Sequence, residues 1–222
     1  MCFSATASFG AAAVLIPAGV YCLKQSHKLK QPYWLIALLP LVFGLQQVFE
    51  GFVWLDLASL SPDPRLPALG FMFFSHFFWL LWVPLACFAV ETNPLRRRLF
   101  MGVTALGTIH GLLMYVPLWI HPDWLSVEIN QHSISYKATL LYDEYIPRIL
   151  SRVLYALIVL IPLLLSSQFY VRLFGVIIFF SVAFATIFYG YAFISVWCFF
   201  AALLSLYILY MISQLKKAQT QI

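Results

Sequence analysis

The segment Pro67–Val90 reads PALGFMFFSHFFWLLWVPLACFAV and contains no Asp, Glu, Lys or Arg. An α-helix needs ~20 apolar residues to cross the hydrocarbon core of a bilayer, so this segment is long enough to span it. Its imidazole at His76 is the only strongly polar ionisable group in the run. The segment therefore predicts a transmembrane helix that carries a histidine at membrane depth.

The rest of the chain has the same character. Of 222 residues, 63% are hydrophobic and only 9% are charged, whereas roughly a quarter of the residues of a soluble domain are charged. We expect an all-α, polytopic membrane bundle of seven transmembrane helices that forms a single domain over residues 1–222. The seven predicted spans are Phe9–Leu23, Tyr33–Leu55, Pro67–Val90, Leu99–Ile120, Ile149–Ser166, Val171–Tyr191 and Ala192–Leu215.

The loop charges predict an orientation. With seven spans, one side of the membrane receives nine basic residues and one acid, and the other side receives four basic residues and six acids. Cytoplasmic loops carry the excess of Lys and Arg, which places the N-terminus outside and the C-terminus in the cytoplasm. The net charge of +5 is thus an orientation signal, and no nucleic-acid partner is expected; the expected surroundings are the lipid bilayer.

One long external loop, at about residues 121–147, interrupts the helices. Its segment Ser133–Leu140 alternates enough to predict a short strand or hairpin. Such a loop is either a lid or binding element or a simple connector. At the start of the next span, Arg152 either reaches outward or pairs with an acid of this loop. The N-terminus lacks a signal-peptide pattern, so Phe9–Leu23 is expected to be a retained helix, and the four cysteines form no CxxC pair.

The opening Met1–Phe9, MCFSATASF, with Leu15–Tyr21 and the sequence Gln47-x-x-Glu50-Gly51, resembles an uncharacterised bacterial family of small seven-helix membrane proteins that open with Met-Cys-Phe-Ser-Ala-Thr-Ala-Ser. The resemblance implies the seven-helix fold and a location in the bacterial inner (cell) membrane, but no activity. A retinal protein is not expected because the span Ala192–Leu215 has no lysine. A membrane hydrolase of the ceramidase type is not expected because the last span has no histidine.

Three ionisable side chains inside the spans are the best functional clue. Glu50 is the only carboxylate in any apolar run, and His76 and His110 lie in two others. At about 1.5 Å of rise per residue, Glu50 lies ~8 Å and each histidine ~13 Å below the predicted outer ends of their helices. Ionisable groups at such depth are paired, hydrated or functional. Gly107 and Gly111 flank His110. Because glycine has no side chain, another backbone or a cofactor could approach the helix closely at these positions.

Several functions fit this set of residues. Glu50, His76 and His110, with Cys2 as a fourth ligand, match the mixed ligands of zinc or another divalent transition metal, and a hydrolase version acts on a small-molecule or lipid substrate at the outer face. There, Glu50 is instead the general base. The alternatives are a b-type haem held by the two histidines, a proton-coupled transporter that uses Glu50, and a non-catalytic receptor or accessory subunit in which the cluster only joins helices.

Overall fold

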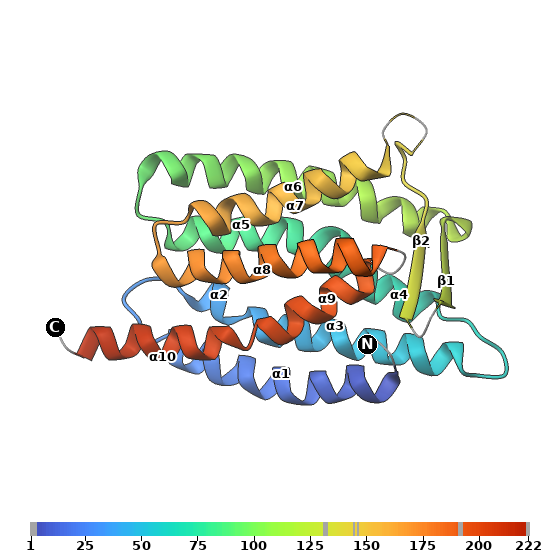
Figure 1. The fold of residues 1–222 in the computed structure, drawn as a ribbon, viewed down its shortest axis with the longest axis horizontal. Coiled ribbons are helices and arrows are strands. Elements are labelled where there is room, and N and C mark those ends of the chain that lie inside the picture. The colour runs from blue at the N-terminus through green and yellow to red at the C-terminus, as the bar shows by residue number, and fades with distance from the viewer. Residues whose placement is uncertain (1–3, 131–132, 144, 146, 191–192, 221–222) are drawn as a thin grey trace.

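The computed structural model describes residues 4–220, apart from residues 131–132, 144, 146 and 191–192. Long helices lie side by side along one direction, and a β-hairpin crosses one end of the bundle (Figure 1). Within the described residues, seven helical spans are long and apolar enough to cross a membrane, as predicted. They are Ala5–Ser26, Trp34–Leu57, Arg65–Val90, Pro94–Ile120, Arg148–Leu165, Phe169–Phe188 and Phe193–Gln219.

Some of these spans are continuous and others are interrupted. The four continuous spans are α1 (Ala5–Ser26), α6 (Pro94–Ile120), α7 (Arg148–Leu165) and α8 (Phe169–Phe188). The interrupted spans are built from α2 (Trp34–Ala37) with α3 (Leu39–Leu57), from α4 (Arg65–Met72) with α5 (Trp79–Val90) through the π-helix η1 (Phe73–Phe78), and from α9 (Phe193–Leu204) with α10 (Tyr207–Thr220). A π-helical segment is rare and is often found at functional sites, and η1 contains His76.

The start of α6 differs from the sequence-based expectation. The side chain of Asn93 accepts hydrogen bonds from the backbone N–H groups of Leu95 (3.0 Å) and Arg96 (3.1 Å), and Pro94 occupies the first turn. An Asn cap followed by proline is a strong helix start. The helix therefore begins at Pro94 rather than near Leu99, and its basic residues belong to its first turns instead of a loop.

The helices pack around a core that runs the length of the bundle. α3 packs against α1 and α9, while α6 packs against α5 and η1, and α7 against α5 and α8. Close approach of α6 depends on glycine: a Cβ at Gly107 would collide with the carbonyl oxygen of Leu80, and one at Gly111 would lie 3.1 Å from the carbonyl oxygen of His76. The expectation that these glycines admit a neighbouring backbone is confirmed.

The polar loop folds as predicted. A short 3-10 turn, η2 (Pro122–Trp124), leads into strand β1 (Leu125–Asn130), which pairs antiparallel with β2 (Ser133–Ala138). β2 is the inner strand, where Ile134 is fully buried and the ring of Tyr136 stacks on Phe71 of α4 at a centroid distance of 4.7 Å. The hairpin is therefore a docked element of the bundle end and not a loose connector.

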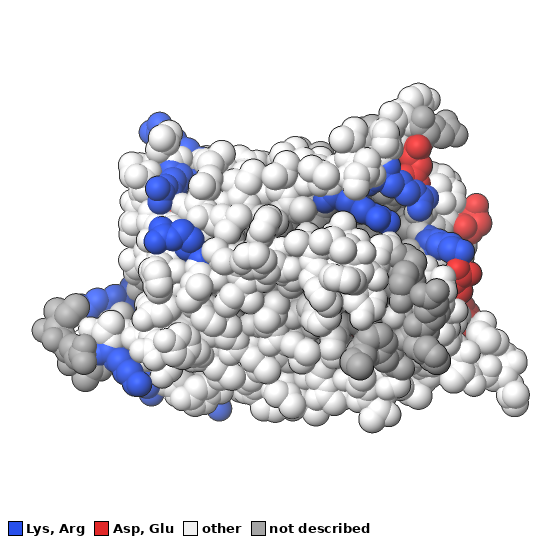
Figure 2. Space-filling model, viewed as in Figure 1, with Lys and Arg blue, Asp and Glu red and all other residues white. Residues whose placement is uncertain are grey.

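Charged side chains gather at the two ends of the bundle. On the face shown in Figure 2, the acidic atoms lie only at the hairpin end, while the opposite end carries only Lys and Arg. The middle of this face is largely uncharged, as expected for a surface in contact with lipid. The assignment of the hairpin end to the outside of the cell remains a prediction from loop charge.

Candidate functional site

Glu50 is fully buried on α3, and its carboxylate has two hydrogen-bond partners. The amide of Gln47 donates to Oε2 at 3.0 Å, and the hydroxyl of Ser195 on α9 donates to Oε1 at 2.5 Å. The neighbouring Gln46, on the same buried face, accepts a hydrogen bond of 2.8 Å from the indole of Trp79. Glu50 thus joins α3 to α9 and bonds a serine, not a histidine.

His76 lies in the π-helix η1 and is 3% exposed. Its Nδ1 is 3.1 Å from the hydroxyl of Ser75, and its ring lines a pocket at the hairpin end of the bundle. The hydrogen bonds of a π-helix run from residue i to residue i+5, so its turns are wider than those of an α-helix. Two consecutive residues of η1, Ser75 and His76, line this pocket.

His110 lies opposite η1 on α6 and is also buried. Its ring stacks on Tyr142 with a centroid distance of 5.9 Å, and its Nε2 has no hydrogen-bond partner among the described residues. Tyr142 shares a hydrogen bond of 2.9 Å with Ser151. Burial raises the pKa of Tyr142, so this phenol is neutral at physiological pH.

The structure separates the predicted ligands into two groups. His76 and His110 lie on the packed elements η1 and α6, whereas the carboxylate of Glu50 is hydrogen-bonded to Ser195 of α9. No group of three or more His, Cys, Asp or Glu side chains within the described part of the chain is arranged to hold a metal ion. Cys2, the predicted fourth ligand, lies outside the described residues.

The pocket beside His76 has a pronounced basic character. Its volume of about 100 Å³ is several times the roughly 10–15 Å³ that one water molecule needs. No described Asp or Glu lines it, while two arginines, two serines and one histidine do. The lining residues come from η1, α6, α7, α9, the hairpin strand β2 and the segment that follows β2. They include Ser75, His76, Tyr136, Arg148, Ser151 and Arg152.

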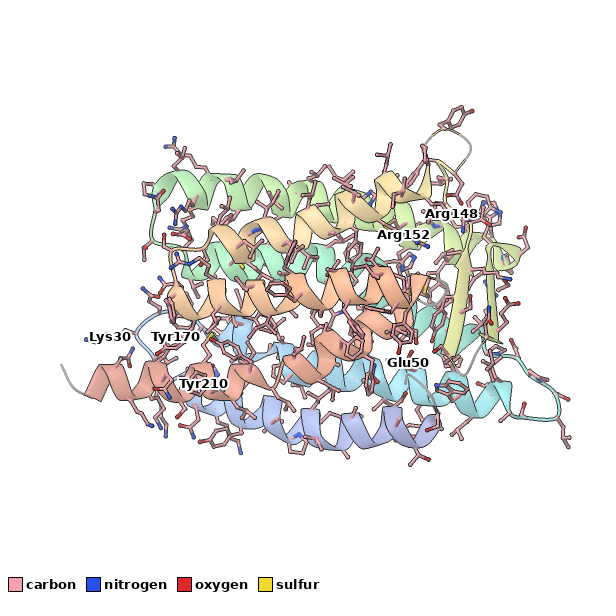
Figure 3. All side chains as sticks on the ribbon, viewed as in Figure 1. Lys30, Glu50, Arg148, Arg152, Tyr170 and Tyr210 are labelled. Atoms are coloured by element: carbon pink, nitrogen blue, oxygen red, sulfur yellow. The ribbon has the colours of Figure 1, made fainter. Side chains whose placement is uncertain are left out.

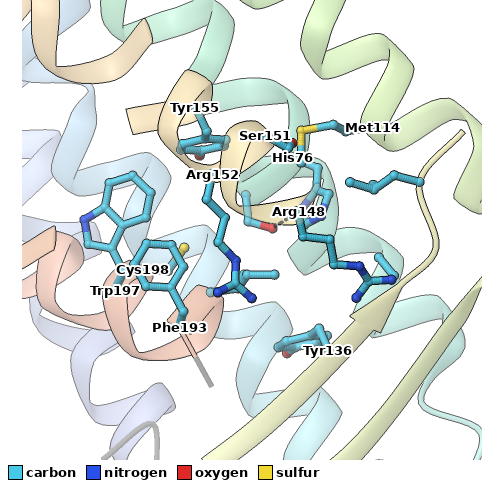
Figure 4. Close-up of a pocket in the computed structure, with 14 residues that line it drawn as sticks. His76, Met114, Tyr136, Arg148, Ser151, Arg152, Tyr155, Phe193, Trp197 and Cys198 are labelled. Atoms are coloured by element: carbon cyan, nitrogen blue, oxygen red, sulfur yellow. Dashed lines mark hydrogen bonds between the residues drawn. The ribbon is translucent and has the colours of Figure 1, made fainter. Parts of the chain in front are cut away.

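The two arginines both line this pocket because they lie on the same face of α7. Arg148 and Arg152 are four residues apart on α7 and therefore share a face, and Figure 4 shows their side chains extending in the same direction beside His76. Arg148 bonds Asp143 at 2.9 Å. Arg152 lies over the ring of Phe193 at 5.7 Å and has no ion pair among the described residues. Arg152 therefore lines the pocket and pairs with none of the described loop acids, while Glu144 lies outside the described residues.

A small second cavity lies beside this basic pocket. It is lined by Arg152, Phe193 and Tyr136, which also line the first pocket, and in addition by Ser195, the partner of Glu50. Figure 3 places Glu50, Arg148 and Arg152 toward the same, hairpin end of the bundle. Glu50 itself lines neither cavity, and its partner Ser195 lines only the smaller one.

Sequence reasoning found His76 but missed most of the pocket. Arg148 and Arg152 stand four apart at the start of an apolar run, which is a signal for two cations on one helix face at the membrane surface. Ser195 gave a weaker signal, as a single small polar residue inside the last apolar run. The two arginines are far in the sequence from His76, and Ser195 is 145 residues from Glu50.

Taken together, seven apolar spans with charged ends and a polar pocket inside one end define an integral membrane protein. The chain belongs to a family of unknown function, DUF6629, whose model matches residues 1–221. The predicted membership of an uncharacterised family is thereby confirmed, while the bacterial origin and the N-terminal motif as a mark of the family stay predictions. Neither a curated protein nor a solved structure matches the chain.

Proposed function

We propose that this membrane protein binds a ligand with a carboxylate or phosphate group in the pocket under the hairpin. The observation that carries the proposal is the cluster of Arg148, Arg152 and His76 around a cavity that no described acid lines. Like charges four residues apart destabilise a helix, and cations at a helix N-terminus oppose its dipole. Asp143 already pairs with Arg148, so a bound anion would chiefly offset the charge of Arg152, which has no ion pair among the described residues.

The geometry also fits an anion in detail. A guanidinium group presents several N–H donors that match the oxygens of carboxylate and phosphate. Ser75 and Ser151 add hydroxyl groups to the side chains that line the pocket. The position of the pocket at the hairpin end of the bundle suits a small molecule or a lipid that arrives at the predicted outer face.

Thermal unfolding of the protein in phosphatidylcholine nanodiscs tests this proposal, because a ligand that binds only the folded state raises the midpoint. One arm adds inorganic phosphate, and the other adds hexadecanoate to the bilayer, so that a free anion and a lipid are distinguished. Loss of one charged hydrogen-bonding group weakens binding by ~1.5–3 kcal/mol, which is about tenfold or more. The variant is Arg152→Gln, and the control is Arg98→Gln, which removes a positive charge at the other end of the bundle.

The proposal predicts a higher midpoint in at least one arm for the native protein and for Arg98→Gln, and a much smaller rise for Arg152→Gln. No rise in either arm, or an equal rise in all three proteins, contradicts it.

Metal binding by Glu50, His76, His110 and Cys2 remains a separate prediction. The described residues do not support it, because the carboxylate of Glu50 is taken up by Ser195 and Gln47. Two measurements on the purified protein test it. In elemental analysis, stoichiometric zinc that is lost in His76→Ala would establish a metal site. In a visible absorption spectrum, a Soret band would establish haem. The transporter, receptor and hydrolase hypotheses likewise await a measurement.

A further inference from the structure

A separate, smaller apolar cavity with a volume of about 40 Å³ lies beside the basic pocket. Its lining includes Val83 of α5, Val159 and Leu163 of α7, Phe174 of α8 and Ala201 of α9, and it contains no charged side chain. Three residues, Tyr155, Trp197 and Cys198, line both this cavity and the basic pocket. The two spaces therefore meet at one set of side chains.

The two spaces follow a single face of α7. Ser151 and Tyr155 line the basic pocket, and Tyr155, Val159 and Leu163 line the apolar cavity. These positions recur every four residues, so they lie along one stripe of the helix. From Ser151 to Leu163 the stripe extends ~18 Å at the rise of an α-helix. This is close to half of the ~30 Å thickness of the hydrocarbon core, which is the depth of one lipid leaflet.

The boundary between the spaces is formed by two aromatic side chains. The rings of Tyr155 and Trp197 meet edge to face with a centroid distance of 5.3 Å, and Trp197 also stacks on Phe193, the ring beneath Arg152. Aromatic rings of this kind present apolar faces to a hydrocarbon chain and a polar edge to a head group. Tyr155 and Trp197 thus present both kinds of surface where the two spaces adjoin.

We infer that the ligand is an anionic amphiphile with a single hydrocarbon chain, whose head group binds Arg148 and Arg152 and whose chain lies between α5, α7, α8 and α9. The inference rests on the proposed function and deepens it by naming the ligand class. Charge and polarity are complementary along the whole path: two cations lie at the end near the hairpin, and apolar side chains line the end near the bilayer midplane. A free inorganic anion would leave the apolar cavity without a role.

The test compares the binding of octanoate with the binding of hexadecanoate to the protein in phosphatidylcholine nanodiscs. The concentration of each acid is expressed as its mole fraction in the bilayer, so that the stronger partitioning of hexadecanoate into the lipid does not affect the comparison. Binding is followed by tryptophan fluorescence. Two variants fill the apolar cavity, Ala201→Leu and Val159→Phe, and the control Leu203→Phe enlarges an exposed side chain on the same helix as Ala201. Binding of octanoate by a variant shows that it is folded with an intact head-group site.

The inference predicts that the native protein and Leu203→Phe bind hexadecanoate at least tenfold more tightly than octanoate. Ala201→Leu and Val159→Phe are expected to lose most of this preference and to keep their affinity for octanoate. If both filled variants keep the preference while Arg152→Gln still weakens both acids, the chain lies elsewhere and only the inference fails. If Arg152→Gln binds both acids as the native protein does, the inference fails together with the proposed function.

Discussion

The carboxylate of Glu91 offers a sharp test of how the predicted cytoplasmic end of the bundle is held together. Glu91 directly follows α5 and is 5% exposed. Its Oε1 accepts hydrogen bonds from the backbone N–H groups of Thr92 (2.9 Å) and Asn93 (2.8 Å), and its Oε2 accepts one from the N–H of Ser167 (2.8 Å), in the connection between α7 and α8. One side chain therefore joins two connections that are far apart in the sequence.

The structure sets the size of the effect of Glu91→Ala. Hydrogen bonds to a charged group contribute ~1.5–3 kcal/mol each. Water can replace the carboxylate at the exposed Thr92 and Asn93, but less well at the half-buried Ser167. We expect a loss of about 2–4 kcal/mol, which is one full charged hydrogen bond and part of the others. The assay is SDS-induced unfolding of the protein in mixed micelles.

The matched control is Glu128→Ala, which breaks the exposed ion pair between Glu128 and Lys137 on the hairpin. Surface ion pairs contribute ~0–1 kcal/mol, so this variant should stay close to the native protein. If Glu91→Ala and Glu128→Ala unfold within about 0.5 kcal/mol of each other, where one charged hydrogen bond alone is ~1.5–3 kcal/mol, the reasoning about Glu91 is refuted.

The same contact predicts a pH dependence. Burial alone would raise the pKa of the Glu91 carboxyl, but the hydrogen bonds from Ser167 and from the two following backbone amides lower it below its ordinary value. A carboxyl whose pKa is lower in the folded state stabilises the fold above its unfolded value of ~4.3, and this contribution is lost as the pH falls through the folded value. The difference between the native protein and Glu91→Ala should be constant from about pH 6 to 8 and shrink below ~4.3.

Three further predictions concern packing and topology. Gly107→Ala should destabilise the protein by about 1–3 kcal/mol in SDS unfolding because its Cβ collides with the carbonyl oxygen of Leu80, whereas Gly102→Ala on the same helix meets nothing within 4 Å and should be neutral or stabilising; equal effects would contradict the observed packing of α6. Ser195→Ala should lose ~1.5–3 kcal/mol in the same assay because it removes a donor from the buried carboxylate of Glu50, and a loss below ~0.5 kcal/mol would show that the contact is weak. A reporter that is active only outside the cytoplasm, fused to the C-terminus, should be inactive, and activity would reverse the predicted orientation.

The spans were predictable because a helix in lipid must be both long and apolar, and the sequence records both properties directly. The hairpin was predictable because Ser133–Leu140 alternates in polarity. The boundaries were less predictable: α6 begins at Pro94, where Asn93 caps the helix, while the run of apolar residues starts later. Capping is a local hydrogen-bond effect, and hydrophobicity does not report it.

The partners of the polar groups were not predictable. Glu50 bonds Ser195, 145 residues away, and the choice of helix neighbours depends on the packing of whole faces rather than on any one residue. The sequence placed Glu50 with the histidines because all three lie at similar depth, but depth says nothing about direction around the helix axis. The pocket was missed for the same reason: Arg148 and Arg152 line it because their face of α7 lies toward η1 and α9, and the sequence does not report that rotation of the helix about its axis.

Native mass spectrometry is the most direct test of the central claim, that Arg152 and its neighbours bind an anionic group inside the bundle. The protein is purified from nanodiscs that contain phosphatidylcholine with a small fraction of hexadecanoate, and the masses retained by the folded protein are recorded. The native protein and Arg98→Gln are expected to retain one hexadecanoate, and Arg152→Gln is expected to retain none. Retention of the same number by all three proteins, or by none of them, would contradict the account.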